Sequence, residues 1–111
     1  ILETARTSGD DWAVKTAAEI EAKSPTSLKV TLAALRNART LDSLEDCLNV
    51  EFRIISRMFD APDFREGVRA AVIDKDQSPR WQLASLSEVP ETAVSAHFAP
   101  LGPKELGLIP A

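Results

Sequence analysis

The sequence predicts an all-α fold, because its long segments have helical periodicity and none has the signals of a strand pair. Apolar residues recur at three- and four-residue intervals, and no β-branched or aromatic run lies between hairpin turns. Serine and aspartate stand where N-terminal helix caps are expected. We expect about five helices and no sheet, with helices at 10–22, 25–38, 41–59, 63–73 and 90–98 and an irregular tail over 100–111.

The first two predicted helices begin at recognisable caps. Asp10 can accept hydrogen bonds from free backbone N–H groups, and its charge complements the helix dipole. Ser24 is a favourable N-cap, and Pro25 follows at the first helical position, where a missing N–H costs nothing. The chain begins at Ile1 without a cap, and its only methionine is Met58. We therefore expect a removed presequence or a piece of a longer protein.

The third predicted helix is the longest and has the widest apolar face. Six apolar residues fall within one narrow arc: Leu41, Leu44, Leu48, Phe52, Ile55 and Phe59. Four more extend that arc on one side: Cys47, Val50, Ile54 and Met58. The opposite sector is polar. We expect this helix to pack against more than one neighbour.

One charged residue, Glu51, projects into the apolar arc of that helix. A carboxylate in such a place is costly unless it is paired. We expect a salt bridge with Arg69 of the following helix. The alternative is that Glu51 faces a partner domain or a site completed elsewhere.

The fourth predicted helix has capping-box spacing between Asp63 and Glu66. Gly67 lies inside the helix, where a close approach of another backbone would explain it. The segment 74–86 reads as a loop with Trp81 as an anchor. A buried stripe is expected from Phe64, Val68, Ala71 and Val72.

Composition excludes several classes of protein. The 111 residues carry a net charge of −4 and scattered basic residues, which argues against nucleic-acid binding. No apolar run approaches the roughly 20 residues that span a membrane. The single cysteine, Cys47, cannot form an internal disulfide, so we expect the cytoplasm.

No complete catalytic or metal-binding set is recognisable. His97 is the only histidine, so a serine nucleophile has no typical base and a zinc site lacks ligands. The acidic pattern at Asp74 and Asp76 imitates a calcium loop, but the sixth and twelfth positions are Pro79 and Ser85 instead of glycine and glutamate. We expect no catalytic residue and no metal ligand in this chain.

Three segments resemble one family. They are Lys-Ser-Pro-Thr-Ser-Leu-Lys-Val-Thr at 23–31, Glu-Phe-Arg at 51–53, and Asp-Phe-Arg-Glu-Gly at 63–67 with its continuation Val-Arg-Ala-x-x-Ile-Asp-Lys-Asp-x-x-Pro-x-Trp at 68–81. Over about residues 10–108 the sequence resembles the C-terminal helices of 3-hydroxyisobutyryl-CoA hydrolases, a branch of the crotonase superfamily.

The resemblance implies a parent enzyme that hydrolyses the thioester of 3-hydroxyisobutyryl-CoA in valine catabolism. Its catalytic groups would lie in an N-terminal core, on which these helices pack, helping to close the acyl-CoA site and to assemble a homo-oligomer. It implies no cofactor beyond the coenzyme A of the substrate, and the mitochondrial matrix as location in a eukaryote. Phe64 and Lys75 are the residues expected nearest to coenzyme A.

Two alternatives remain open. The parent could be an enoyl-CoA hydratase or isomerase, or the chain could be a stand-alone helical interaction module. A segment that lies on another domain should expose a contiguous apolar surface and should self-associate when isolated. A stand-alone module should turn its apolar residues inward.

Overall fold

The computed structural model describes residues 1–111 and contains six α-helices and no strand. The helices are α1 (Leu2–Thr7), α2 (Asp11–Glu21), α3 (Pro25–Ala38), α4 (Leu44–Asp60), α5 (Pro62–Val68) and α6 (Glu91–Ala96). A π-helical turn, η1 (Arg69–Ile73), continues α5, and two short 3-10 turns are η2 (Leu86–Glu88) and η3 (Gly102–Lys104). The all-α prediction is confirmed, with one helix more than expected.

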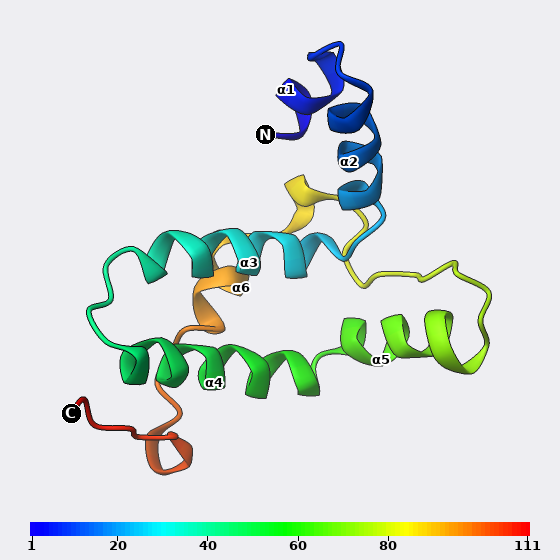
Figure 1. Ribbon diagram of the computed structural model, residues 1–111. Coiled ribbons are helices and arrows are strands. Elements are labelled where there is room, and N and C mark those ends of the chain that lie inside the picture. Colours follow the sequence, from blue (N-terminus) through cyan, green and yellow to red (C-terminus); the bar gives the residue numbers. More distant parts are fainter.

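Helices α3 and α4 run antiparallel, α6 packs across them on one side, and α5 extends roughly in line beyond the end of α4 (Figure 1). Helices α1 and α2 pack against each other beside the start of α3, where Arg6 pairs with Glu21. A long loop returns from η1 toward the start of α3 (Figure 1). No helix is both long enough and apolar enough to cross a membrane.

Local capping explains most helix starts. Asp10 accepts from the N–H of Trp12, and Ser24 accepts from the N–H of Ser27, as the sequence predicts. Helix α4 starts at Leu44 and not at 41, because Ser43 caps it by accepting from the N–H of Asp46.

The predicted capping box of the fourth helix is wrong. The N-cap of α5 is Ala61, which has no capping side chain, and Pro62 takes the first helical position. The carboxylates of Asp63 and Glu66 instead contact residues far away in the sequence. The helix also changes at Arg69 into the π-helical turn η1, where the backbone ring widens.

The hydrophobic core is small. Four buried residues form it: Val30 of α3, Ile54 of α4, Val89, and Val94 of α6. Val50 and Met58 of α4 pack against this cluster. Only 8 of 111 residues are buried, and the radius of gyration is 16.1 Å, against about 13 Å expected for a compact domain of this length. The helices therefore form an open arrangement.

The wide apolar face of α4 is divided between two surroundings. Its Val50, Ile54 and Met58 side faces the core, whereas the other side is exposed. The predicted buried stripe of the fourth helix is also exposed, because no other element of the chain covers it. We name the exposed set the apolar strip: Leu44, Leu48, Ile55 and Phe59 of α4 and Phe64, Val68 and Val72 of α5 and η1.

The polar face of α4 is not simply solvated, because the C-terminal tail lies along it. Arg53 forms an ion pair with Glu105, its Nε lying 2.7 Å from a carboxylate oxygen. Arg57 donates to the carbonyl oxygens of His97 and Pro100. Asn49 exchanges two hydrogen bonds of 2.9 Å with the backbone of Leu108. The tail is largely irregular, as expected, but it is anchored.

Candidate functional site

A groove of about 450 Å³ lies between the start of α3 and the segment formed by α5 and η1. Phe64, Val68 and Val72 of the apolar strip line one wall. Met58, Trp81 and His97 contribute further lining, and Lys23 and Ser27 lie at the α3 side. Most of the exposed surface of the lining is apolar, so the groove suits a hydrophobic side chain or an uncharged part of a ligand.

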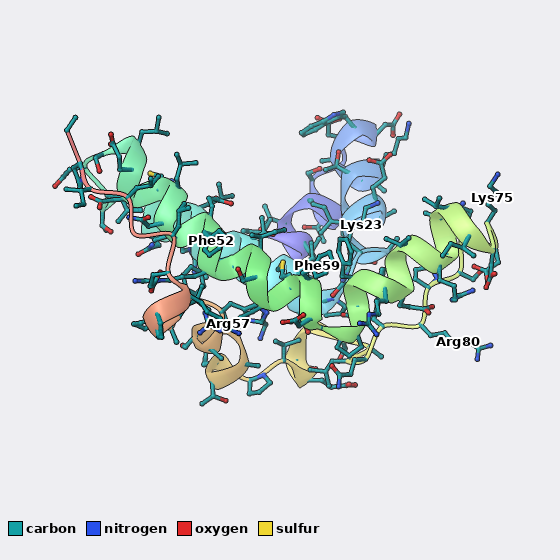
Figure 2. The ribbon with its side chains drawn as sticks, turned by 90° about the horizontal axis from the view of Figure 1, so that it is seen from below. Lys23, Phe52, Arg57, Phe59, Lys75 and Arg80 are labelled. Carbon is teal, nitrogen blue, oxygen red and sulfur yellow. The ribbon has the colours of Figure 1, made fainter.

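The rings of Phe59 and Phe64 make contact where α4 passes into α5. Their centroids lie 5.3 Å apart and the planes are inclined by 38°, an arrangement that aromatic pairs favour. This contact joins the exposed apolar residues of α4 to those that line the groove. Phe52 and Phe59 project from one side of α4 and Arg57 from the other (Figure 2).

Trp81 anchors the returning loop, as the sequence predicts. Its indole N–H donates to the carbonyl oxygen of Ala22, at 3.2 Å. Its six-membered ring lies over Gly67, where an added Cβ would be 3.5 Å from the nearest ring carbon. The neighbour of Gly67 is therefore an aromatic side chain, and the expected approach of another backbone is wrong.

Asp63 joins three segments through one carboxylate. One oxygen accepts from the hydroxyl of Ser24 at 2.5 Å, and the other accepts from the N–H of Gln82 at 2.8 Å. Ser24 is buried and also caps α3. The start of α3, the start of α5 and the end of the loop are thus fixed to one another around the groove.

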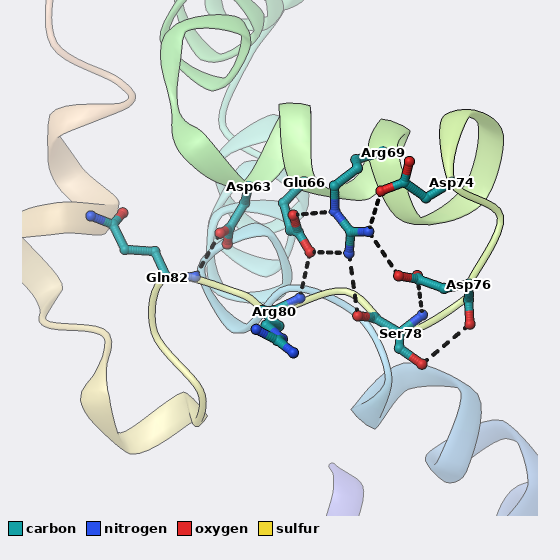
Figure 3. A network of polar contacts seen from close by, with 8 residues as sticks. All are labelled: Asp63, Glu66, Arg69, Asp74, Asp76, Ser78, Arg80 and Gln82. Carbon is teal, nitrogen blue, oxygen red and sulfur yellow. Dashed lines mark hydrogen bonds and ion pairs between the residues drawn. The ribbon is translucent and has the colours of Figure 1, made fainter.

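A network centred on Arg69 holds the rest of the loop (Figure 3). The Arg69 guanidinium donates two hydrogen bonds to Glu66, at 2.8 and 2.7 Å. It also pairs with Asp74 at 2.8 Å and with Asp76 at 2.7 Å. Glu66 accepts in addition from the N–H of Arg80, at 2.7 Å. One arginine therefore ties η1 and the loop to α5.

The same contacts shift the pKa values of the carboxyl groups. Hydrogen bonds from Arg69 and from the N–H of Arg80 lower the pKa of Glu66 from 4.5 to about 2. Arg69 and the N–H of Ser78 lower the pKa of Asp76. The carboxylates in turn raise the pKa of Arg69. Glu66, Asp76 and Arg69 are therefore charged at neutral pH.

The expected salt bridge between Glu51 and Arg69 is wrong. Arg69 is occupied by Glu66, Asp74 and Asp76. Glu51 is exposed on α4 and makes no ion pair or hydrogen bond within the chain. Its alternative role, facing a partner domain, stays a prediction.

The two residues expected nearest to coenzyme A lie apart from each other. Phe64 is 44% exposed at the start of α5, beside the groove. Lys75 is exposed just beyond η1. It is eleven residues after Phe64, which corresponds to about 16 Å along a helix axis. Its side chain extends from that end of the molecule (Figure 2). Lys75 and Gln77 both have φ of 56°, in the left-handed region. Asp76 between them is held by Arg69, and the N–H of Gln77 donates to Ala70.

No group of three or more histidine, cysteine, aspartate or glutamate side chains is placed to hold a metal ion. His97 lines the groove, and its Nδ1 donates a hydrogen bond of 2.8 Å to the carbonyl oxygen of Ala93. Cys47 is half-buried and unpaired. The residues that organise this region hold the loop in place around the groove.

Comparison with known proteins decides the family. The model of the enoyl-CoA hydratase/isomerase family matches residues 1–98. The chain belongs to this family. Within it, the chain is 44% identical over 108 residues to the 3-hydroxyisobutyryl-CoA hydrolase of Gallus gallus, and 41% identical over 106 residues to that of Homo sapiens. These matches cover 97% and 96% of the chain but 28% and 27% of the relatives, in their C-terminal part.

Solved structures of the family have the same arrangement of helices. A carnitinyl-CoA dehydratase from Mycobacterium thermoresistibile matches with a TM-score of 0.87 and 38% identity, over 96% of the chain and 30% of that protein. An enoyl-CoA hydratase from Rhodobacter sphaeroides 2.4.1 matches with a TM-score of 0.89 and 32% identity, over 97% and 32%. The chain thus spans between a quarter and a third of these members of the family.

The structure explains the residues of the family motif at 63–81. Its acidic residues, its Gly67 and its Trp81 are those that fix the loop around the groove. Sequence reasoning treated the carboxylates as a helix cap and an imitation calcium loop, and it missed the network. Arg69 could have indicated the network from the sequence. It lies inside the motif, and it is the one arginine within eight residues of Glu66, Asp74 and Asp76 alike.

Proposed function

We propose that this chain is the C-terminal helical part of an acyl-CoA thioester hydrolase similar to 3-hydroxyisobutyryl-CoA hydrolase, acting in valine catabolism. In this proposal the helices pack on an N-terminal catalytic core, help to close the acyl-CoA site and take part in assembling a homo-oligomer. The catalytic groups belong to the core, so the chain alone is inactive. No cofactor is needed beyond the coenzyme A of the substrate.

The observation that carries the proposal is the apolar strip. Seven large apolar side chains along α4, α5 and η1 are exposed in one connected set, while the chain's own core has four residues. Exposed apolar patches of this kind mark a surface that another body covers. Identity near 40% to curated hydrolases supports the hydrolase branch of the family.

Phe64 and Lys75 are proposed contacts of coenzyme A. Phe64 offers an exposed ring beside the groove, on which an adenine or the pantetheine arm could rest. Lys75 offers an exposed ammonium group that suits phosphate. A ligand that reaches both must be long, and coenzyme A has that length.

The proposed location is the cytoplasm, or the mitochondrial matrix in a eukaryote. The vertebrate relatives that support the second location carry the word mitochondrial in their names. The acidic net charge of −4 supports partners other than nucleic acid.

The second candidate function is an enoyl-CoA hydratase or isomerase, favoured by the hydratase and dehydratase structures that the chain resembles. Turnover by the full-length protein separates the two. The hydrolase proposal expects release of free coenzyme A from 3-hydroxyisobutyryl-CoA, and no hydration of crotonyl-CoA above background. Hydration of crotonyl-CoA without thiol release would contradict it.

The 111-residue chain is the matched control in that assay. We expect it to release no thiol from 3-hydroxyisobutyryl-CoA, since it lacks a nucleophile–base pair. Hydrolysis by this chain would show that it carries its own catalytic set. A third possibility, a stand-alone interaction module, requires a well-behaved monomer, which the open arrangement with 16.1 Å radius of gyration disfavours.

A further inference from the structure

Glu51 lies in an apolar setting on the exposed side of α4. On a helix, side chains three and four positions away are the neighbours of a residue. For Glu51 these are Cys47, Leu48, Ile54 and Ile55, all apolar. No cation of its own helix is within reach, and the exposed carboxylate has no partner elsewhere in the chain.

The carboxylate lies at the edge of the apolar strip. At about 100° per residue, Glu51 is about 20° from Leu44 of the strip on one side and about 20° from Met58, which packs on the core, on the other. A surface that covers the strip up to this edge also covers Glu51. Removing a carboxylate from water without a partner is costly, and pairing it with a cation offsets that cost.

A second copy of α4 is a poor occupant for this surface. The α4 part of the apolar strip runs from Leu44 to Phe59, so its midpoint falls between residues 51 and 52. A two-fold symmetric, antiparallel pairing that buries the whole length would bring Glu51 opposite Glu51 of the second copy. Like charges in contact repel in such an interface. The basic residues of α4, Arg53 and Arg57, are committed to the C-terminal tail on the opposite face.

We infer that the apolar strip is covered by an apolar surface that carries one lysine or arginine, and that this cation pairs with Glu51. The inference rests on the proposed function, which places that surface on the catalytic core of the same protein. The relatives have ample chain for it, since the match covers 28% of the Gallus gallus protein. The ion pair sets the register of α4 on the core, because the apolar contacts alone permit sliding along the strip.

The test uses the full-length protein with Ile55→Cys, a thiol inside the strip one turn from Glu51. The rate of maleimide labelling at position 55 is read by mass spectrometry and compared with the rate in the unfolded protein. The same thiol is then measured with Glu51→Gln and with Glu51→Lys. Glu19→Lys is the matched control, because Glu19 is an exposed carboxylate of α2 that has no partner. Circular dichroism verifies that each variant remains helical.

We expect the thiol to be strongly protected in the parent, and Glu51→Lys to accelerate its labelling at least about tenfold, because a paired buried charge has been reversed. Glu51→Gln, which keeps the shape, should accelerate it less, and Glu19→Lys less than about twofold. If Glu51→Lys does not fold, the Glu51→Gln variant decides.

Three results would overturn the inference. If the thiol at position 55 is protected equally in the parent and in both Glu51 variants, the ion pair is contradicted and the proposed packing is not. If the thiol at position 55 of the folded parent reacts as fast as in the unfolded protein, the proposed packing is contradicted as well. Protection that disappears on dilution of the protein would identify a second copy as the occupant and contradict the assignment to the core.

Discussion

The indole ring of Trp81 lies over Gly67, and a Cβ atom at position 67 would meet it at 3.5 Å, an ordinary van der Waals distance. The two residues are fourteen positions apart, and the Arg69 network holds the loop that brings them together. The glycine thus leaves room for one more carbon atom, but not for a larger side chain. Both residues line the groove, as does Phe64.

Gly67→Ala should therefore be tolerated, and Gly67→Leu should not. Alanine gains up to about 1 kcal/mol of helix propensity at this position, whereas leucine must displace the ring at a cost of about 1–3 kcal/mol. Urea unfolding of the chain measures both. Equal destabilisation by the two variants would show that the ring does not occupy this place.

Acid should release the loop from α5. The pKa of Glu66 is lowered from 4.5 to about 2, so its stabilising contribution is complete above pH 4.5 and is lost as the pH falls toward 2. Fluorescence of Trp81, in a chain with Trp12→Phe, should change within this window. Glu66→Gln should reduce that change, leaving the part that comes from Asp76, and the control Glu19→Gln should leave it unaltered. An unchanged acid transition in Glu66→Gln would contradict the role of this carboxyl group.

Loss of Arg53 should free the C-terminal tail. Arg53 pairs with Glu105 and also donates to the carbonyl oxygen of Phe98. Solvent screens this ion pair in part, so Arg53→Gln should accelerate tryptic cleavage after Lys104 by about two- to fivefold. Arg39→Gln is the control, since Arg39 is exposed and unpaired. Equal cleavage of the two variants would mean that the tail is not held in this way.

Lys75 should act on substrate binding and not on the chemical step. In the full-length enzyme, Lys75→Ala should raise KM for the CoA thioester about three- to tenfold, equivalent to about 1 kcal/mol, with kcat little changed. A thioester of N-acetylcysteamine, which lacks the phosphates, should show no difference between parent and variant. A loss confined to kcat, or an equal loss with the truncated substrate, would contradict the proposed phosphate contact.

The parts of the fold that could be predicted are those governed by local interactions. The start of α3 depends on Ser24 and Pro25, and both act within one turn. The apolar pattern predicts a start of the α4 helix at Leu41, three residues too early, because Leu41 continues the pattern although Ser43 caps the helix. A pattern of apolar residues does not distinguish a helical turn from the loop that precedes it.

The parts that could not be predicted depend on contacts that are distant in sequence. Asp63 has the spacing of a helix cap, yet its two carboxylate oxygens accept hydrogen bonds from Ser24 and Gln82 instead. The apolar arc of α4 is apparent from the sequence, but the sequence does not say that Ile54 faces the chain's own core while Ile55 faces outward. Helical periodicity shows that one face of a helix is apolar, but it does not show which part of the protein covers that face.

Sedimentation of the 111-residue chain tests most directly the claim that another protein surface covers its apolar strip. We expect association that increases with concentration, and we expect Leu48→Glu and Ile55→Glu to suppress it while helical content is kept. Glu51→Gln should strengthen it, because the carboxylate opposes pairing of two strips. A clean helical monomer at high concentration, unaffected by these variants, would contradict the account.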